Sequence, residues 1–300
     1  MLKRTITGAI IFIITLGFVL LKQVHALFFD AYAVIVTYAA LHEILEAYKV
    51  ADKRPNKIAL YAVPALMCLV FNLAKDVYQA MMFNILIAMV LLVYLLTNDV
   101  IEFAHNRKYD LTEKNVSVLN QTLFEKTKIS MMVYAYPLLP LSFLFALNHM
   151  PYEVGYIGIA LIFAVSMLTD TCAYFVGRLW GKTKFIPEVS PKKTIAGVAG
   201  GFIGGIIGAL SCYFLFYYTD WFTVLKLAGP GASISAFLII AVIGSYINQL
   251  GDLIASALKR KIGIKDFSQI FPGHGGFMDR VDGMMFVSVF VYVILAIFFV

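Results

Sequence analysis

Acidic and basic side chains are concentrated between residues 252 and 282 of a chain that is otherwise strongly apolar. The stretch GDLIASALKRKIGIKDFSQIFPGHGGFMDRVD, which begins at Gly251, carries four carboxylates among five lysine or arginine residues. Carboxylates can bind a divalent metal ion, and neighbouring cations can offset the negative charge of phosphate groups. This composition therefore indicates phosphate chemistry.

Helical spacing would gather the first polar residues of this stretch on one face. If the apolar segment that ends at Leu250 continues as a helix, then Asp252, Ser256 and Lys259 follow at i, i+4 and i+7. Residues at this spacing share one side of a helix. We therefore expect a carboxylate, a hydroxyl and an ammonium group to face the same space.

Two further acids, Asp279 and Asp282, stand three residues apart where the last apolar segment begins. They can converge with Asp252, and Mg²⁺ suits such a set because it takes few protein oxygens and keeps water and substrate phosphates as its other ligands. The spacing predicts that Asp252, Asp279 and Asp282 hold the metal. Lys259 and Arg280 are expected to bind phosphate oxygens.

Between the two helices, the segment Pro272–Gly276 contains three glycines and is predicted to form a turn. Glycine allows a positive φ and a close approach of the backbone to a ligand, which suits a loop that holds phosphate. We assign His274, Gly275 and Gly276 to phosphate contact.

The alternative is an ordinary loop whose basic residues serve membrane topology. Asp252 argues against it: Leu253, Ile254 and Ala255 follow directly, which places the carboxylate near membrane depth. Acids at such positions are costly and usually functional.

A second polar group runs from Asp170 to Thr194 and contains DTCAYFVGR, GK and SPKKT. The SPKKT segment is expected at the start of a helix, where free amides and the positive end of the dipole bind anions. A triphosphate is the expected ligand. The alternative, that Ser190 caps the helix with Pro191 in its first turn while the lysines serve topology, can hold at the same time.

These motifs resemble the phosphatidate cytidylyltransferases, also called CDP-diacylglycerol synthases. The signature of that family resembles S-x-x-K-R-x4-K-D-x-S-x2-F-P-x-H-G-G-F-x-D-R-V-D, and every element of it is present from Ser256 to Asp282. The segments DxxAYxxGRxxGK and SPKKT are also similar to the family, so the motifs cover Asp170 to Asp282. One departure is Ala196, where the family often has Glu or Gln.

The resemblance implies a reaction in which CTP and phosphatidate give CDP-diacylglycerol and pyrophosphate. It implies Mg²⁺ at Asp252 and Asp279 and leaves a second, monovalent cation open. The expected catalytic residues are Asp252, Asp279, Lys259 and Arg280. The expected substrate- and nucleotide-binding residues are Asp170, Tyr174, Arg178, Lys182, Ser190, Lys192, Lys193, Thr194, Ser256, Arg260, Lys265, His274, Gly275 and Gly276.

The elements that must position these residues are membrane helices. Of the 300 residues 61% are hydrophobic and only 14% are charged, whereas soluble domains are roughly a quarter charged. Nine apolar runs are each long enough for a hydrocarbon layer of about 30 Å. They span residues 6–21, 27–47, 58–74, 81–97, 129–147, 156–176, 196–218, 232–250 and 283–300. We predict an all-α polytopic membrane protein, divided into residues 1–128 and a catalytic region 129–300.

Charge asymmetry predicts the orientation, since short cytoplasmic loops collect Lys and Arg. With a cytoplasmic N-terminus, 21 of the 24 basic residues fall on the cytoplasmic side, and only Lys22, Lys75 and Lys226 on the other. The loop 98–128 is expected to be a solvated connector, or else a short interfacial helix. The polar residues thus face the cytoplasm, at the cytoplasmic membrane.

Other functions are less well supported. The net charge of +6 comes without a basic stripe interleaved with aromatics, so a nucleic-acid partner is not expected. Related enzymes, such as another CTP-using lipid nucleotidyltransferase or a polyprenol kinase, stay open, as does a homodimer. A transporter is the least favoured reading, because the polar residues gather at the ends of apolar runs and not in their middle.

Overall fold

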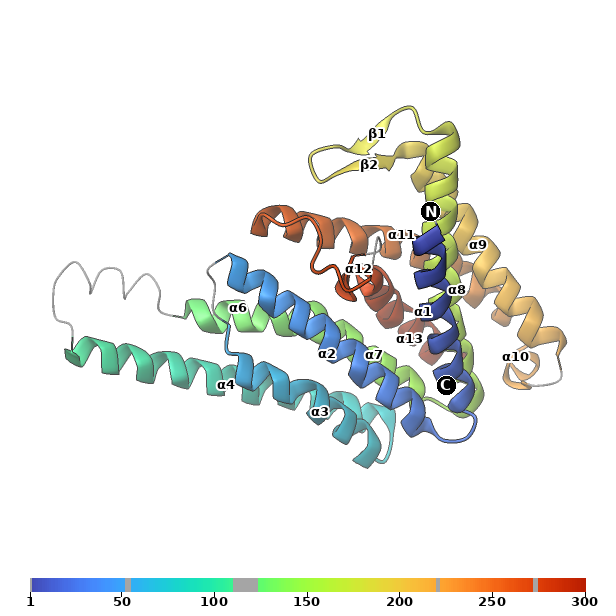
Figure 1. Ribbon diagram of the computed structural model, residues 1–300. Helices are drawn as coiled ribbons and strands as arrows, with labels where there is room; N and C mark the ends of the chain where they lie inside the picture. Colours follow the sequence, from blue (N-terminus) through green and yellow to red (C-terminus); the bar gives the residue numbers. More distant parts are fainter. Residues whose placement is uncertain (1, 52–54, 110–123, 220–221, 272–274) are drawn as a thin grey trace.

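The computed structural model describes residues 2–51, 55–109, 124–219, 222–271 and 275–300. The chain is built from helices, as predicted, and Figure 1 shows them running in a bundle, with the chain start and a small hairpin toward one end. The N-terminal helices are α1 (Leu2–Leu21), α2 (Ala26–Val50), α3 (Lys57–Leu73) and α4 (Val77–Tyr109). The middle of the chain forms α6 (Glu125–Val133), η1 (Tyr134–Leu138), α7 (Leu139–Asn148) and α8 (Tyr152–Trp180).

The remaining elements carry most of the expected site residues. They are β1 (Lys184–Ile186), β2 (Ser190–Thr194), α9 (Ile195–Tyr218), α10 (Val224–Leu227), α11 (Pro230–Ile262), α12 (Met278–Val281) and α13 (Met284–Phe299). Seven helical segments of the described chain are long and apolar enough to cross a membrane. Two shorter apolar helices, Gly8–Leu21 and Lys57–Leu73, accompany them. The all-α, membrane-type architecture is therefore confirmed.

Several boundaries differ from the predicted ones. Helix α11 continues to Ile262, as the shared face of Asp252, Ser256 and Lys259 requires. Helix α4 continues to Tyr109, so the first part of the expected connector 98–128 is helical, and residues 110–123 of it lie outside the described residues. The predicted span 129–147 is divided into α6, η1 and α7. Pro137 lies inside η1 and cannot donate the amide hydrogen bond that a regular helix needs.

The SPKKT segment does not begin a helix as predicted, because Ser190–Thr194 is strand β2 and pairs antiparallel with β1. Lys184 lies opposite Thr194, and Ile186 lies opposite Ser190. The residue that caps α9 is Thr194 and not Ser190: its hydroxyl accepts a hydrogen bond from the amide of Gly197 at 3.1 Å. Pro191 is tolerated because a two-stranded hairpin has only edge strands.

Small residues let α9 approach both of its neighbours. A Cβ on Gly204 or Gly208 would overlap backbone of α8, and one on Gly201 or Gly205 would overlap side chains of α11. The glycine run in α9 therefore packs three helices closely together, as its spacing predicts. The consequence for the site is that the ends of α8 and α9 and the middle of α11 are held at fixed separations.

Candidate functional site

The two polar groups of the sequence meet where β2 and α8 lie against α11. Lys193 of β2 donates to Asp252 Oδ2 at 2.8 Å and to the carbonyl oxygen of Gln249 at 3.1 Å. Asn248 of α11 donates to Asp170 Oδ1 of α8 at 2.8 Å. Residues about 80 positions apart in the sequence thus form one site, and the link depends on the length of α11.

Three carboxylates of this site lie near enough for their charges to interact. The charges of Asp252 and Asp170 both act on Asp282, which is 8% exposed at the junction of α12 and α13. Asp170 is exposed and Asp252 is half-buried, so the group lies at the surface of the bundle. The positive charges of Lys193 and Arg280 also act on the carboxyl group of Asp170, against the effect of Asp252. The arrangement places carboxylate oxygens, which can bind a metal ion, close to cationic side chains, which can bind phosphate.

Asp279 has different surroundings from those predicted. Its Oδ1 accepts from Lys259 Nζ at 2.6 Å, and its Oδ2 accepts from the amides of Gly276 at 2.9 Å and Phe267 at 3.1 Å. Lys259 is itself buried and lies over the ring of Phe267, 5.4 Å from its centroid. Both oxygens of Asp279 are therefore engaged within the protein.

No group of three or more His, Cys, Asp or Glu side chains is close enough to hold a metal ion among the described residues. The charges of Asp170 and Asp252 act on Asp282, and those of Asp252, Asp279 and Asp282 all act on the hydroxyl of Tyr136. The assignment of Asp252, Asp279 and Asp282 to a metal stays a prediction.

Of the predicted glycine-rich turn, Gly275 and Gly276 belong to the described residues. Gly275 has a φ of +80°, and its carbonyl accepts from the amide of Phe271 at 3.0 Å. The amide of Gly276 is directed at Asp279 and so is not turned toward a ligand. His274 lies outside the described residues.

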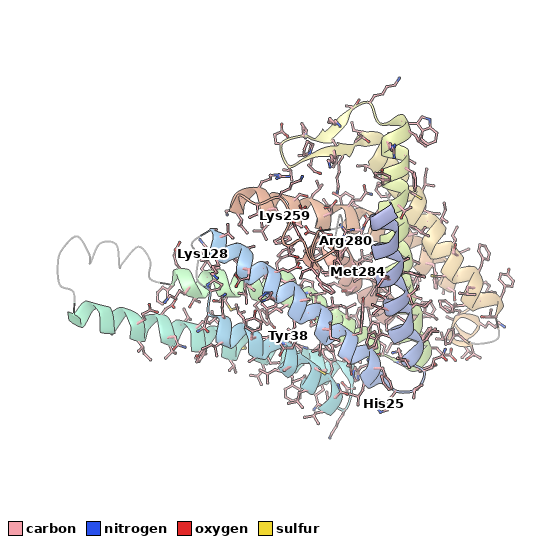
Figure 2. All side chains as sticks on the ribbon, viewed as in Figure 1. His25, Tyr38, Lys128, Lys259, Arg280 and Met284 are labelled. Carbon is pink, nitrogen blue, oxygen red and sulfur yellow. The ribbon has the colours of Figure 1, made fainter. Side chains whose placement is uncertain are left out.

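The other predicted residues are distributed over the surface around this site. Arg178 Nη1 donates to Tyr174 Oη at 3.2 Å, and both side chains are exposed on the last turns of α8. Ser256 is buried, on the same helix as Asp252 and Lys259. Ser190 is half-buried, and the exposed cations are Lys182, Lys192, Arg260, Lys265 and Arg280. Figure 2 labels Lys259 and Arg280, which come from the neighbouring elements α11 and α12.

Two residues of the site were not predicted. Asn248 positions Asp170, and an amide inside a predicted span could have indicated it. Tyr136 of η1 has a buried hydroxyl without a hydrogen-bond partner among the described residues. The charges of Asp282, Asp279 and Asp252 act on this hydroxyl. The backbone of Tyr136 is extended, with φ −147° and ψ 106°, so the hydroxyl is carried by the kink between α6 and α7.

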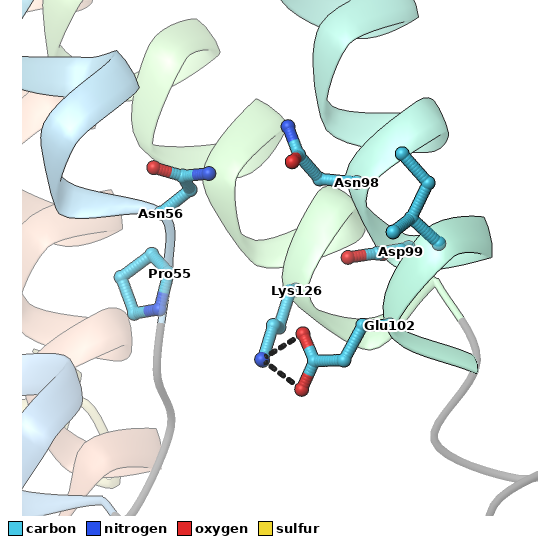
Figure 3. Close-up of a pocket in the computed structure, with 7 residues that line it drawn as sticks. Pro55, Asn56, Asn98, Asp99, Glu102 and Lys126 are labelled. Carbon is cyan, nitrogen blue, oxygen red and sulfur yellow. Dashed lines mark hydrogen bonds and ion pairs between the residues drawn. The ribbon is translucent and has the colours of Figure 1, made fainter. Parts of the chain in front are cut away.

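Two other polar regions lie apart from this site. A cavity of about 490 Å³ lies between the ends of α4 and α6 (Figure 3), lined by Pro55, Asn56, Asn98, Asp99, Ile101, Glu102 and Lys126. None of the motif residues lines it. The second is a buried network in which Lys22 donates to Asn148 Oδ1 at 2.7 Å and Asn148 donates to Asp30 at 2.8 Å. Burial lowers the pKa of Lys22 to about 8, and the charge of Asp30 opposes this shift.

Comparisons with known proteins cover the whole chain. The sequence profile of the Cytidylyltransferase family matches residues 2–298. A phosphatidate cytidylyltransferase of Staphylococcus saprophyticus is 31% identical over 288 residues, which cover 95% of each chain. One of Staphylococcus haemolyticus is 30% identical over the same coverage, and one of Bacillus subtilis is 42% identical over 147 residues, 49% of each chain.

Proposed function

Because this chain belongs to the cytidylyltransferase family, we propose that it joins CTP to phosphatidate and releases pyrophosphate. Family membership makes the chain an enzyme, a nucleotidyltransferase of phospholipid biosynthesis. In the proposed reaction an oxygen of the phosphatidate phosphate forms a bond to the α-phosphorus of CTP. The bond from that phosphorus to the bridging oxygen of the β-phosphate breaks, and pyrophosphate leaves in line with the attack. The products are CDP-diacylglycerol and pyrophosphate.

The observation that carries this proposal is the meeting of the two polar groups through Lys193 and Asp252. Nucleotidyl transfer has to place two phosphate-bearing substrates side by side, and positioning with charge neutralisation supplies most of the catalysis. Lys193 and Arg280 supply positive charge near Asp170. The exposed Asp170 and half-buried Asp252 leave the site open to a nucleotide from water.

No strong general base is needed for this reaction. The phosphate of phosphatidate has a second pKa of about 6 by analogy with a phosphorylated side chain, and is therefore largely ionised near neutral pH. The carboxylates of the site are better assigned to binding than to proton transfer. In the structure Asp252 and Asp279 each pair with a lysine ammonium group, at 2.8 and 2.6 Å.

The residues present fit Mg²⁺ through the interacting carboxylates. Asp252 and Asp282 would hold it, with Asp170 at the edge of the same group, since this metal is usually bound by one or two carboxylates plus substrate phosphates. Such an ion would offset the charge of the triphosphate and polarise its phosphoryl oxygens. Asp279 stays a predicted metal ligand. To bind the metal, its carboxylate would have to give up its hydrogen bond from Lys259.

We place the site at the cytoplasmic face of the cytoplasmic membrane, with nine crossings and a cytoplasmic N-terminus. Seven long apolar helices and two shorter ones support this number. The asymmetry of 21 against 3 basic residues supports the orientation. A site at the membrane edge admits the lipid from the bilayer and CTP from water.

The proposal is tested by incubating the purified protein with phosphatidate, cytidine-labelled CTP and Mg²⁺, and identifying the lipid product by mass spectrometry. We expect labelled CDP-diacylglycerol and an equal amount of pyrophosphate. A polyprenol kinase would instead release CDP and leave no cytidine on any lipid. Absence of a CDP-lipid across several metals and acyl chains would overturn the proposal.

A further inference from the structure

Glu43 of α2 lies far from the motifs in sequence. Its carboxylate accepts hydrogen bonds from the segment between α11 and α12 and from the start of α12. Glu43 is 2% exposed. Its Oε1 accepts from Ser268 Oγ at 2.5 Å and from the amide of Phe277 at 2.9 Å, and its Oε2 accepts from the amide of Met278 at 2.8 Å. Among the described residues no lysine or arginine forms an ion pair with it, so its charge is compensated by these donors.

The same loop is held from the other side by Asp279. That carboxylate accepts from the amides of Phe267 and Gly276, and Glu43 accepts from the amides that follow Gly276 directly. A Cβ on Gly276 would overlap the carboxylate of Glu43, and one on Gly275 would lie 2.7 Å from Asp279 Oδ2. The two glycines are thus required because two carboxylates approach one short stretch of backbone.

The cost of burying the carboxylate of Glu43 indicates that its role is to position the backbone that donates to it. A buried carboxylate is costly within an apolar helix unless donors satisfy both of its oxygens. Hydrogen bonds to a charged acceptor are roughly twice as strong as neutral ones and fix the donors more tightly. Glu43 therefore fixes the backbone at Phe277 and Met278, which directly precede Asp279 and Arg280.

We propose that Glu43 is a positioning residue for nucleotidyl transfer, which sets the start of α12 so that Arg280 and Asp282 face the reacting phosphates. The inference rests on the proposed function. It makes α2, which lies outside the motif region 170–282, a part of the catalytic apparatus. Glu43 touches neither substrate in this account and acts only through the loop.

The test compares Glu43→Gln and Glu43→Ala with the wild type in the CDP-diacylglycerol assay. Gln keeps one acceptor oxygen and Ala keeps none, so we expect kcat to fall about tenfold and about a hundredfold, respectively. The KM for CTP should change by less than about threefold, because Glu43 has no hydrogen bond to the segment 170–194, whose expected ligand is the triphosphate. The matched control is Glu46→Gln, one turn further along α2, where the side chain is 42% exposed and pairs with Lys57 at 2.8 Å.

Hydrogen exchange separates positioning from a general loss of structure. In Glu43→Gln the amides of Phe277 and Met278 should exchange at least about tenfold faster, while those of α8 and α9 keep their wild-type rates. If the wild type is active and Glu43→Ala has the same kcat, the inference is overturned but the proposed function is not. Faster exchange throughout the bundle would overturn it as well, because Glu43 would then serve stability alone. An inactive wild type would instead overturn the proposed function.

Discussion

At the scale of single residues, the carboxylates of the site fall into two kinds. Asp170, Asp252 and Asp282 act on one another through their charges, and Asp170 is exposed and Asp252 half-buried at the surface of the bundle. Asp279 is buried and already holds an ammonium group and two amides. The first kind suits ligand binding, whereas Asp279 organises the loop around it in the structure.

Replacing either Asp252 or Asp279 by asparagine should nevertheless abolish turnover. Asp252→Asn removes a charge that a metal and Lys193 require, and Asp279→Asn leaves the buried Lys259 without its partner. We expect CDP-lipid formation to fall at least about a hundredfold in both, with normal insertion into the membrane. The control is Glu102→Gln, which alters an exposed ion pair on α4 and should keep full activity.

The two variants also distinguish the proposed roles. If Asp279 only organises the loop, Asp279→Asn should lower the thermal midpoint more than Asp252→Asn does, since only the former is buried. Near-normal activity of Asp252→Asn would contradict its assignment to the metal. The sequence singled out all four aspartates, but it did not separate Asp279 from the other three. Spacing along a helix does not reveal which loop amides donate hydrogen bonds to a carboxylate.

At the scale of elements, the hairpin β1–β2 carries Lys193 across to α11. Lys193→Met should raise the KM for CTP about tenfold, because the site loses one cation and the hairpin loses its bond to Asp252. Lys184→Met on β1, whose side chain is exposed, serves as the control and should leave the KM unchanged. Equal effects of the two substitutions on the KM would show that only the overall charge of the hairpin matters.

The contact between α8 and α9 depends on glycine. In Gly204→Ala the new Cβ would overlap the carbonyl oxygen of Leu168, so the two helices have to separate. Overpacking of this kind costs about 1–3 kcal/mol, and we expect a thermal midpoint several degrees below that of the wild type in detergent. Gly17→Ala in α1 is the matched control, since nothing lies within 4 Å of the added Cβ. A midpoint unchanged in Gly204→Ala would mean that the helices are not closely packed there.

Some elements were predictable from sequence and others were not. The shared face of Asp252, Ser256 and Lys259 was predicted on the condition that the helix continues past Leu250, and α11 meets that condition. The hairpin was missed because SPKKT also has the composition of a helix start, and only pairing with β1 decides between the two. Glu43 was missed because no local pattern surrounds it, although an acid inside an apolar run is itself a signal of function.

At the scale of the whole molecule, the structure supports a bundle in which the N-terminal helices contribute to the site. Helix α2 contacts the motif loop through Glu43 and is joined to α7 and α3 through the network of Asp30. The division at residue 128 that the sequence suggested stays a prediction.

The orientation of the bundle is tested by labelling with a membrane-impermeant maleimide in a background without the three native cysteines. Lys75→Cys lies between α3 and α4 and should be labelled in intact cells. Lys184→Cys in the hairpin should be labelled only after the cells are permeabilised. Both lysines are exposed, so accessibility alone does not bias the comparison. The reverse pattern would place the proposed site on the outer face.

The central claim is that phosphatidate receives the α-phosphate of CTP with its cytidine, and it is tested most directly by following the two ends of the triphosphate. The purified protein is given phosphatidate and Mg²⁺ with CTP labelled either at the α- or at the γ-phosphorus. The account predicts that the α-label enters the lipid and the γ-label appears only in pyrophosphate, and that Asp252→Asn suppresses both. A γ-label recovered in the lipid, or an α-label that never reaches it, would contradict the account.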